Sequence, residues 1–226
     1  MVLKAANTAF VLDTVPDPVP GAGEAVARVL ACGSGLTIQH VKAGRVPARF
    51  PRIIGHEITG EIVEVGPGVT SLAVGVPVTA YYYLNCGRCR WCLSGLEPLC
   101  EASEGNVGKD CDGGYAEYIK LPSSNFISLP EGLDYKAYPA EIGVITDALA
   151  TPLKVLKRGR VKAGETIAVF GAGGGLGIHM LMIAHWAHAR VIAVDVAASK
   201  LDACREAGAD EIVDATAGNV TDALLE

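Results

Sequence analysis

The chain has 226 residues, half of them hydrophobic, and a formal net charge of −6 at neutral pH. This length suffices for one large domain or two ordinary ones with a substantial core. The negative charge argues against a nucleic-acid or anionic-membrane partner. No apolar run reaches the roughly 18–20 residues that cross a bilayer, and no leader follows Met1. Seven cysteines without a leader predict a cytoplasmic protein whose thiolates bind metal rather than form disulfides.

The first 130 or so residues read as β-structure cut by turns. Apolar and polar residues alternate over short runs that are separated by glycine and proline clusters, which is typical of antiparallel strands. The predicted strands are 24–31, 60–65, 76–82, 115–121 and 125–129.

Four cysteines within this β-rich part predict a metal site. They are Cys86, Cys89, Cys92 and Cys100. Their close spacing suits four thiolates around one tetrahedral zinc ion, and the intervening residues are too few for two unstrained disulfides. Because the protein would fill all four positions, this zinc would be structural. Free or disulfide-bonded cysteines are the alternative.

From about residue 148 the pattern changes to alternating helices and strands. The predicted helices are 149–158, 175–189 and 199–207, and the predicted strands are 166–170, 191–195 and 211–213. Another helix begins at 221–226. Strands that are apolar on both faces and alternate with helices predict a parallel sheet covered on both sides. We therefore place a domain boundary near residues 145–160.

A glycine run, Gly171–Gly177, follows the first of these strands and opens a helix. Glycines at such a turn let the backbone approach a pyrophosphate, which the helix N-terminus then binds. Asp195 ends the next strand, where an acid can accept hydrogen bonds from ribose hydroxyls but repels a 2′-phosphate. The pattern favours NAD over NADP. A domain that binds another nucleotide, or none, is the alternative.

These motifs together resemble the zinc-dependent medium-chain alcohol dehydrogenases. Gly55-His56-Glu57, the cysteine cluster, the DGGYAEY run at 112–118 and the glycine run occur in that family's order. The resemblance implies an α/β protein with a β-rich part: a GroES-like catalytic domain at 1–148 and an incomplete doubly wound Rossmann domain at 149–226. It also implies NAD-linked interconversion of an alcohol and a carbonyl compound.

The resemblance further assigns roles by position. Thr37 and His40 match the pair that relays the alcohol proton to solvent, and Thr151 matches the residue near the nicotinamide. The remaining cofactor-binding residues are Gly171, Gly173, Gly174, Gly175, Leu176 and Gly177 in the loop, with Asp195 and Lys200 at the ribose.

The expected catalytic zinc site departs from the family pattern. Gly35 stands where a ligand cysteine is usual, and Asp147 matches a subgroup in which aspartate replaces the second cysteine. His56, Glu57 and Asp147 remain as candidate ligands. Carboxylate and imidazole ligands also support zinc catalysis, as in His₂Glu sites. The alternative is that these acids bind no metal.

Family members are longer and have six parallel strands in the nucleotide domain, so this chain resembles a C-terminally truncated member. Three functions stay open. The first is a zinc-assisted NAD-dependent dehydrogenase of a secondary or cyclic alcohol, or its ketone, with a CoA-linked alcohol as one variant. The second is an enone or carbonyl reductase without catalytic zinc. The third is an inactive, zinc-stabilised fragment. At full length we expect a homo-oligomer.

Overall fold

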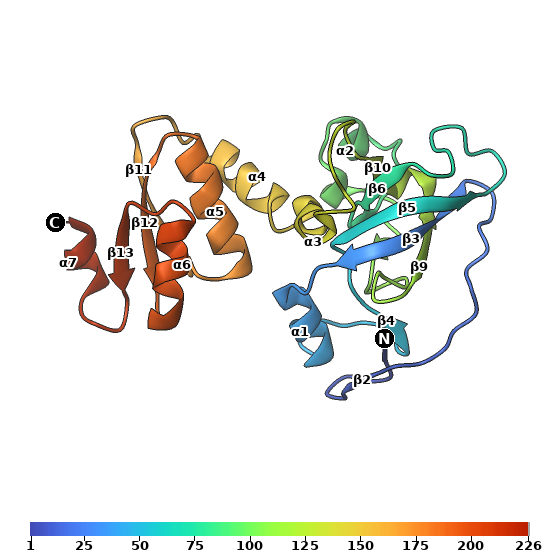
Figure 1. The fold of residues 1–226 in the computed structure, drawn as a ribbon, viewed down its shortest axis with the longest axis horizontal. Coiled ribbons are helices and arrows are strands. Elements are labelled where there is room, and N and C mark those ends of the chain that lie inside the picture. Colours follow the sequence, from blue (N-terminus) through green and yellow to red (C-terminus); the bar gives the residue numbers. More distant parts are fainter. Residues whose placement is uncertain (226) are drawn as a thin grey trace. The chain divides into compact units, whose positions relative to one another are not determined.

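The computed structural model describes residues 1–225. The chain folds as two compact units, Met1–Thr146 and Asp147–Glu226. The sequence places the boundary two residues later. Both units appear in Figure 1 with their elements labelled.

The first unit is built mainly of antiparallel strands. Its strands are β1 (Val2–Leu3), β2 (Phe10–Val11), β3 (Glu24–Cys32), β4 (Arg52–Ile53), β5 (Ile58–Val65), β6 (Pro77–Ala80), β7 (Tyr83–Leu84), β8 (Gly105–Asn106), β9 (Tyr118–Pro122) and β10 (Phe126–Ser128). Its helices are α1 (Leu36–Lys42), α2 (Arg90–Leu93) and α3 (Pro139–Gly143), with 3₁₀ turns η1 (Glu97–Leu99), η2 (Ser123–Asn125) and η3 (Val144–Thr146).

A five-stranded sheet in the order β10-β6-β5-β3-β9 carries the core of this unit. Its β3 and β5 strands pair antiparallel, with register shifts between Val26 and Ala27 and between Val29 and Ala31. Such bulges increase the local bend and twist of a strand. Apolar side chains from all five strands are buried together, as the alternating pattern predicts. They include Ala25, Ala27, Ile58, Ile62, Val78, Ala80, Ile119, Leu121 and Phe126.

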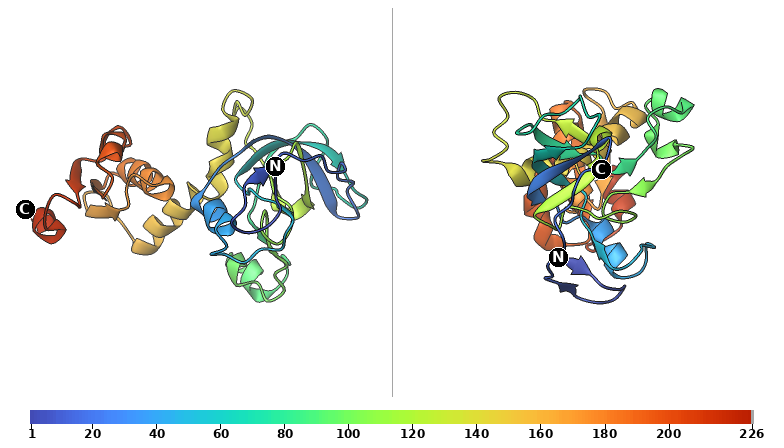
Figure 2. Two further views of the ribbon diagram at one scale, coloured as in Figure 1. Left: turned by 90° about the horizontal axis from the view of Figure 1, so that it is seen from below. Right: turned by 90° about the vertical axis from the view of Figure 1, so that its right-hand side faces the viewer.

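Two smaller sheets complete the first unit. The β1 strand pairs with β2 and with β4, and the short β7 and β8 strands pair antiparallel with each other. Both views in Figure 2 show this unit as a curled sheet with short helices attached to it. The α1 helix buries Ile38 and Val41 in a separate apolar cluster with Leu3 and Ile54.

The second unit alternates helices and strands. Its elements are α4 (Ala150–Gly159), β11 (Thr166–Phe170), α5 (Gly175–Trp186), β12 (Arg190–Asp195), η4 (Ala198–Lys200), α6 (Leu201–Glu206), β13 (Glu211–Asp214) and α7 (Val220–Leu225). The three strands form a parallel sheet in the order β11-β12-β13. Helices α5 and α6 contact each other and the sheet, as β-α-β connections require.

The prediction that every strand of this sheet is covered on both faces is wrong for β11. The central β12 strand is buried from Val191 to Asp195. In β11, however, alternate residues are exposed, and Phe170 keeps 66% of its surface accessible. β11 pairs with one neighbour among the described residues, so an apolar strand sequence did not guarantee cover on both faces.

None of the described helices is both long enough and apolar enough to cross a bilayer.

Candidate active site and metal centre

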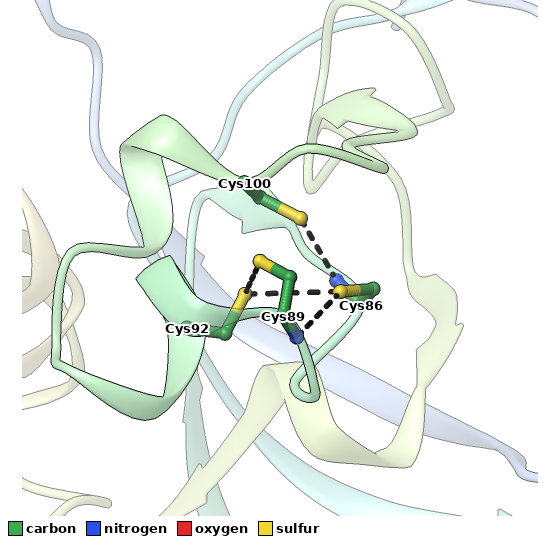
Figure 3. A group of neighbouring side chains, drawn as sticks. All are labelled: Cys86, Cys89, Cys92 and Cys100. Carbon is green, nitrogen blue, oxygen red and sulfur yellow. Dashed lines mark hydrogen bonds between the residues drawn. The ribbon is translucent and has the colours of Figure 1, made fainter.

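The four predicted cysteine ligands converge on one point in the first unit. One sulfur from each of Cys86, Cys89, Cys92 and Cys100 lies within 4.8 Å of the others. The Cys89 and Cys92 sulfurs are 3.5 Å apart, and those of Cys86 and Cys92 are 4.0 Å apart. Tetrahedral zinc with Zn–S bonds of about 2.3 Å separates its sulfurs by about 3.8 Å. Figure 3 shows the four side chains turned towards one another.

The loop around α2 also supplies N–H donors to these sulfurs. The N–H of Cys86 donates to the sulfur of Cys100 at 3.3 Å, and the N–H of Cys89 donates to the sulfur of Cys86 at 3.4 Å. Donors from Cys92 and Glu101 lower the pKa of the Cys89 thiol to about 6. Burial, and then the neighbouring Cys89 thiol, raise the pKa of Cys92 to about 12. A cation between the four sulfurs would stabilise the thiolate form of each.

A small pocket in the same unit brings one predicted catalytic residue and one predicted zinc ligand together. Thr37 on α1 and His56 before β5 both line it. His56 is 4% exposed, and its ring lies against that of Tyr82 with 4.5 Å between centroids. Lys109 lines the pocket as well. The pocket thus places a hydroxyl and an imidazole at one concave site.

The Glu57 side chain packs against the backbone of Gly33 and lies near Gly35. A Cβ atom built on Gly35 would lie 3.4 Å from Oε2 of Glu57, and one built on Gly33 would lie only 2.5 Å from it. The N–H of Gly33 also donates to the backbone carbonyl of Glu57 at 2.8 Å. Glu57 is 4% exposed. The two residues without side chains therefore form a cradle for a buried carboxylate, which is a donor that zinc accepts.

The remaining cysteine near this cradle, Cys32, is held as a neutral thiol. Burial, and then the charge of Glu57, raise the pKa of Cys32 to about 12. Cys32 also lies outside the group of four cysteines whose sulfurs converge.

In the second unit the glycine run forms the predicted turn between β11 and α5. Gly174 is the N-cap of α5, which starts at Gly175. A Cβ atom on Gly177 would lie 2.3 Å from the carbonyl oxygen of Gly171, so the turn needs glycine at this position. Leu176, in the first turn of the helix, is half exposed. The N-terminal N–H groups of α5 have no earlier helical turn to bond and can bind an anion.

Asp195 joins this turn to the end of β12. Its Oδ2 accepts a hydrogen bond from the N–H of Gly173 at 2.8 Å, and its Oδ1 accepts one from the N–H of Ala197 at 2.9 Å. These donors, assisted by Lys200, lower the pKa of the Asp195 carboxyl. A Cβ on Gly173 would lie 2.6 Å from the Lys200 Cβ. The structure therefore brings Gly173, Asp195 and Lys200 together, and each carboxylate oxygen retains a second lone pair for a ligand.

Asp147 and Thr151, the other two predicted residues of the second unit, contact each other. The hydroxyl of Thr151 donates to Oδ1 of Asp147 at 3.0 Å, and its N–H donates to the Asp147 carbonyl at 2.9 Å. Of the three candidate ligands of a catalytic zinc, His56 and Glu57 belong to the first unit and Asp147 belongs to the second.

Sequence reasoning missed three residues of these sites. The Tyr82 ring lies tilted against that of His56, Lys109 lines the pocket, and Arg45 contacts the His40 ring. The run of three tyrosines at the end of the predicted strand 76–82 is a signal for the first. Lys109 and Arg45 lie in loops, where no periodic pattern marks a side chain as part of a site.

Known proteins resemble this chain over most of its length. The alcohol dehydrogenase GroES-like domain matches residues 21–131. An alcohol dehydrogenase from Geobacillus stearothermophilus is 40% identical over 202 residues, covering 88% of this chain. Among solved structures, an acetophenone reductase from Geotrichum candidum in complex with NAD is 33% identical, with a TM-score of 0.85 over 95% of this chain. A cobalt- and zinc-bound thermostable alcohol dehydrogenase from Pyrobaculum aerophilum is 33% identical, with a TM-score of 0.82 over 93% of this chain.

The chain is thus a relative of the zinc-dependent alcohol dehydrogenases, and the predicted fold class, GroES-like followed by part of a Rossmann domain, is confirmed. It spans 58% of the Geobacillus enzyme, 62% of the acetophenone reductase and 64% of the Pyrobaculum enzyme.

We expect the cysteine cluster to bind one zinc ion tightly. Cys100→Ser should abolish that zinc and destabilise the first unit, because three thiolates leave the tetrahedral site open. Zinc content measured by mass spectrometry after dialysis checks this. Cys111→Ser is the matched control, since Cys111 lies outside the cluster. Equal zinc content in both variants would contradict the prediction.

We also expect the Glu57 cradle to distinguish its two glycines. Gly33→Ala should displace the Glu57 carboxylate and lower the free energy of unfolding by about 1–3 kcal/mol, the usual cost of overpacking. Gly35→Ala should change it by less, because its Cβ would be in ordinary contact with Oε2. Urea denaturation measures both variants. A larger loss for Gly35→Ala would show that the cradle is arranged differently.

Proposed function

We propose that this chain is the catalytic and cofactor-binding part of an NAD-dependent oxidoreductase that interconverts a secondary or cyclic alcohol and its ketone. The observation that carries the proposal is the contact of Asp195 with the N–H of Gly173 inside the glycine turn. This contact places an ionised carboxylate beside the turn that opens α5, as a dinucleotide requires. The pocket with Thr37 and His56 supplies polar groups for a substrate oxygen.

The preference for NAD rests on charge. The Asp195 carboxylate can accept hydrogen bonds from both ribose hydroxyls, whereas a 2′-phosphate would meet a negative charge there. Lys200 lies beside Asp195 and offsets part of this charge, but no arginine occurs among the three residues that follow Asp195. The acetophenone reductase that resembles this chain was solved with NAD.

We propose one structural zinc at the four cysteines and a second zinc held by His56, Glu57 and Asp147. A zinc ion at the second site would act as a Lewis acid towards the substrate oxygen. Residues of the chain would bind the substrate, supply charge beside the zinc and transfer the proton. Glu57, buried in its cradle, contributes negative charge beside His56. Thr37 binds the substrate oxygen and passes its proton to His40, and Thr151 packs near the nicotinamide.

A second candidate is a reductase of an activated double bond or carbonyl group that works without catalytic zinc. Gly35 favours it, because this residue offers no metal ligand at the position where the family pattern has a cysteine. An inactive zinc-stabilised fragment predicts no NAD-dependent turnover at all. A CoA-linked substrate and a homo-oligomeric full-length protein stay predictions.

NAD preference should depend on Asp195. We expect Asp195→Ala to weaken NAD binding about 10- to 100-fold, because charged hydrogen bonds to ribose are each worth about 1.5–3 kcal/mol. The NADP-to-NAD affinity ratio should rise, since the repulsion of a 2′-phosphate is removed. Isothermal titration calorimetry with both cofactors measures this, with Asp202→Ala on exposed α6 as the control. A parallel loss of both affinities would indicate only a disordered turn.

The metal proposal should depend on Asp147. In the intact protein we expect about two zinc ions per subunit, one for each proposed site, and NADH formation with secondary alcohols. Asp147→Ala should lose one zinc and turnover together, because a ligand charge is removed. Asp17→Ala, at an exposed acid, is the control. About one zinc in the unmodified protein, with reduction of enones, would favour the zinc-independent reductase instead.

A further inference from the structure

We propose that Arg45 is a positioning residue that fixes the tautomer of His40 by donating a guanidinium hydrogen bond to its Nδ1 atom. The nearest guanidinium nitrogen, Nη1, lies 3.4 Å from Nδ1 of His40. A part for Arg45 in proton transfer rests on the proposed relay function of His40. The contact between Arg45 and His40 does not depend on that function.

The end of α1 explains why Arg45 reaches back to His40. Gly44 adopts the left-handed conformation, with φ of +68°. Its N–H donates to the carbonyl of Val41 at 3.0 Å, and the N–H of Arg45 donates to the carbonyl of His40 at 2.9 Å. This pair of hydrogen bonds is a Schellman motif, which reverses the chain after a helix. The reversal returns Arg45 to the turn of α1 that carries His40.

His40 also shares a helix face with the other predicted relay residue. Thr37 and His40 are three residues apart on α1, so their side chains are neighbours on its surface. Ile38 and Val41 are buried on another face of the helix and hold it in place. His40 is half-buried and Arg45 is exposed. The guanidinium therefore lies on the solvent side of a ring whose helix is firmly packed.

The chemistry of the contact determines where the ring proton lies. A guanidinium has only donors, so a hydrogen bond at this contact makes Nδ1 of His40 the acceptor. In the neutral ring the proton then resides on Nε2, since the hydrogen bond of one ring nitrogen sets the state of the other. The single lone pair of the neutral ring is the one that Arg45 occupies. A proton that reaches His40 must enter at Nδ1, and Arg45 then loses its acceptor and faces a second cation.

Nitrogen NMR of the folded chain tests this without any turnover. With ¹⁵N-labelled histidine, the two ring-nitrogen shifts report the tautomer at alkaline pH, where the ring is neutral, and His40→Gln assigns the signal. We expect the Nε2–H form to dominate. Arg45→Ala should lower the ratio of Nε2–H to Nδ1–H about two- to fivefold, which corresponds to about 0.4–1 kcal/mol for one exposed hydrogen bond from a charged donor. Arg45→Lys should restore part of the ratio, because lysine also donates.

Arg49→Ala is the matched control, since Arg49 lies in the same loop and its carbonyl bonds the side chain of Arg52 rather than the His40 ring. It should leave the ratio unchanged. Unaltered signals from the other four histidines verify that each variant is folded. A dominant Nδ1–H form in the unmodified chain, or a ratio that Arg45→Ala does not move, would overturn the inference. If only the NAD and zinc experiments failed, the inferred hydrogen bond from Arg45 to His40 would still hold. Only the relay role of His40 would be lost.

Discussion

Close backbone approach between three glycine-containing segments is the constraint on which the first unit's site depends. A Cβ atom on Gly113 would lie 2.0 Å from the carbonyl oxygen of Gly55, and one on Gly108 would lie 2.6 Å from the same atom. The N–H of Gly114 donates to that oxygen at 2.9 Å. These contacts hold the segment that enters β5, and His56 and Glu57 are the two residues between Gly55 and that strand. The buried imidazole and carboxylate are therefore placed by backbone packing as well as by their own side-chain contacts.

Close contact between glycine backbones also shapes the second unit, where it forms the turn between β11 and α5. Its glycine turn is also closed by a backbone contact, between Gly171 and Gly177, but here a charged side chain completes the site. Asp195 ties the turn to β12 through the N–H of Gly173, so one carboxylate organises the loop and is also the proposed partner of the ribose. In the first unit the carboxylate of Glu57 packs against Gly33 and Gly35. In the second unit the carboxylate of Asp195 satisfies backbone donors, which is why its pKa is lowered.

Spacing and periodicity predicted most of the elements and the closed metal site. The Thr166–Phe170 strand is observed with the predicted bounds, and the four cysteines converge, because each signal is local in sequence. The sequence could not predict the contact of Glu57 with Gly33 and Gly35 or that of Tyr82 with His56, since chain segments far apart in sequence create them. The cover of β11 was mispredicted for a related reason. An apolar strand sequence reports what a strand can bury, whereas burial depends on which elements pack against it.

The two candidate metal sites differ in whether the chain leaves a coordination position open for a substrate. This difference follows from the donor atoms at each site. The four cysteine sulfurs come from one short loop and account for all four positions of a tetrahedral ion, so no position remains for a substrate. Beside His56, by contrast, the chain offers the buried carboxylate of Glu57, and Gly35 has no side chain that could bind a metal. Relative to two thiolates, one carboxylate carries one negative charge fewer and is a harder donor, so a zinc ion bound here would be retained less tightly and would act more strongly on a carbonyl oxygen. The residue that admits the Glu57 carboxylate is Gly33, whose Cβ would lie 2.5 Å from Oε2, whereas a Cβ on Gly35 would be in ordinary contact with it.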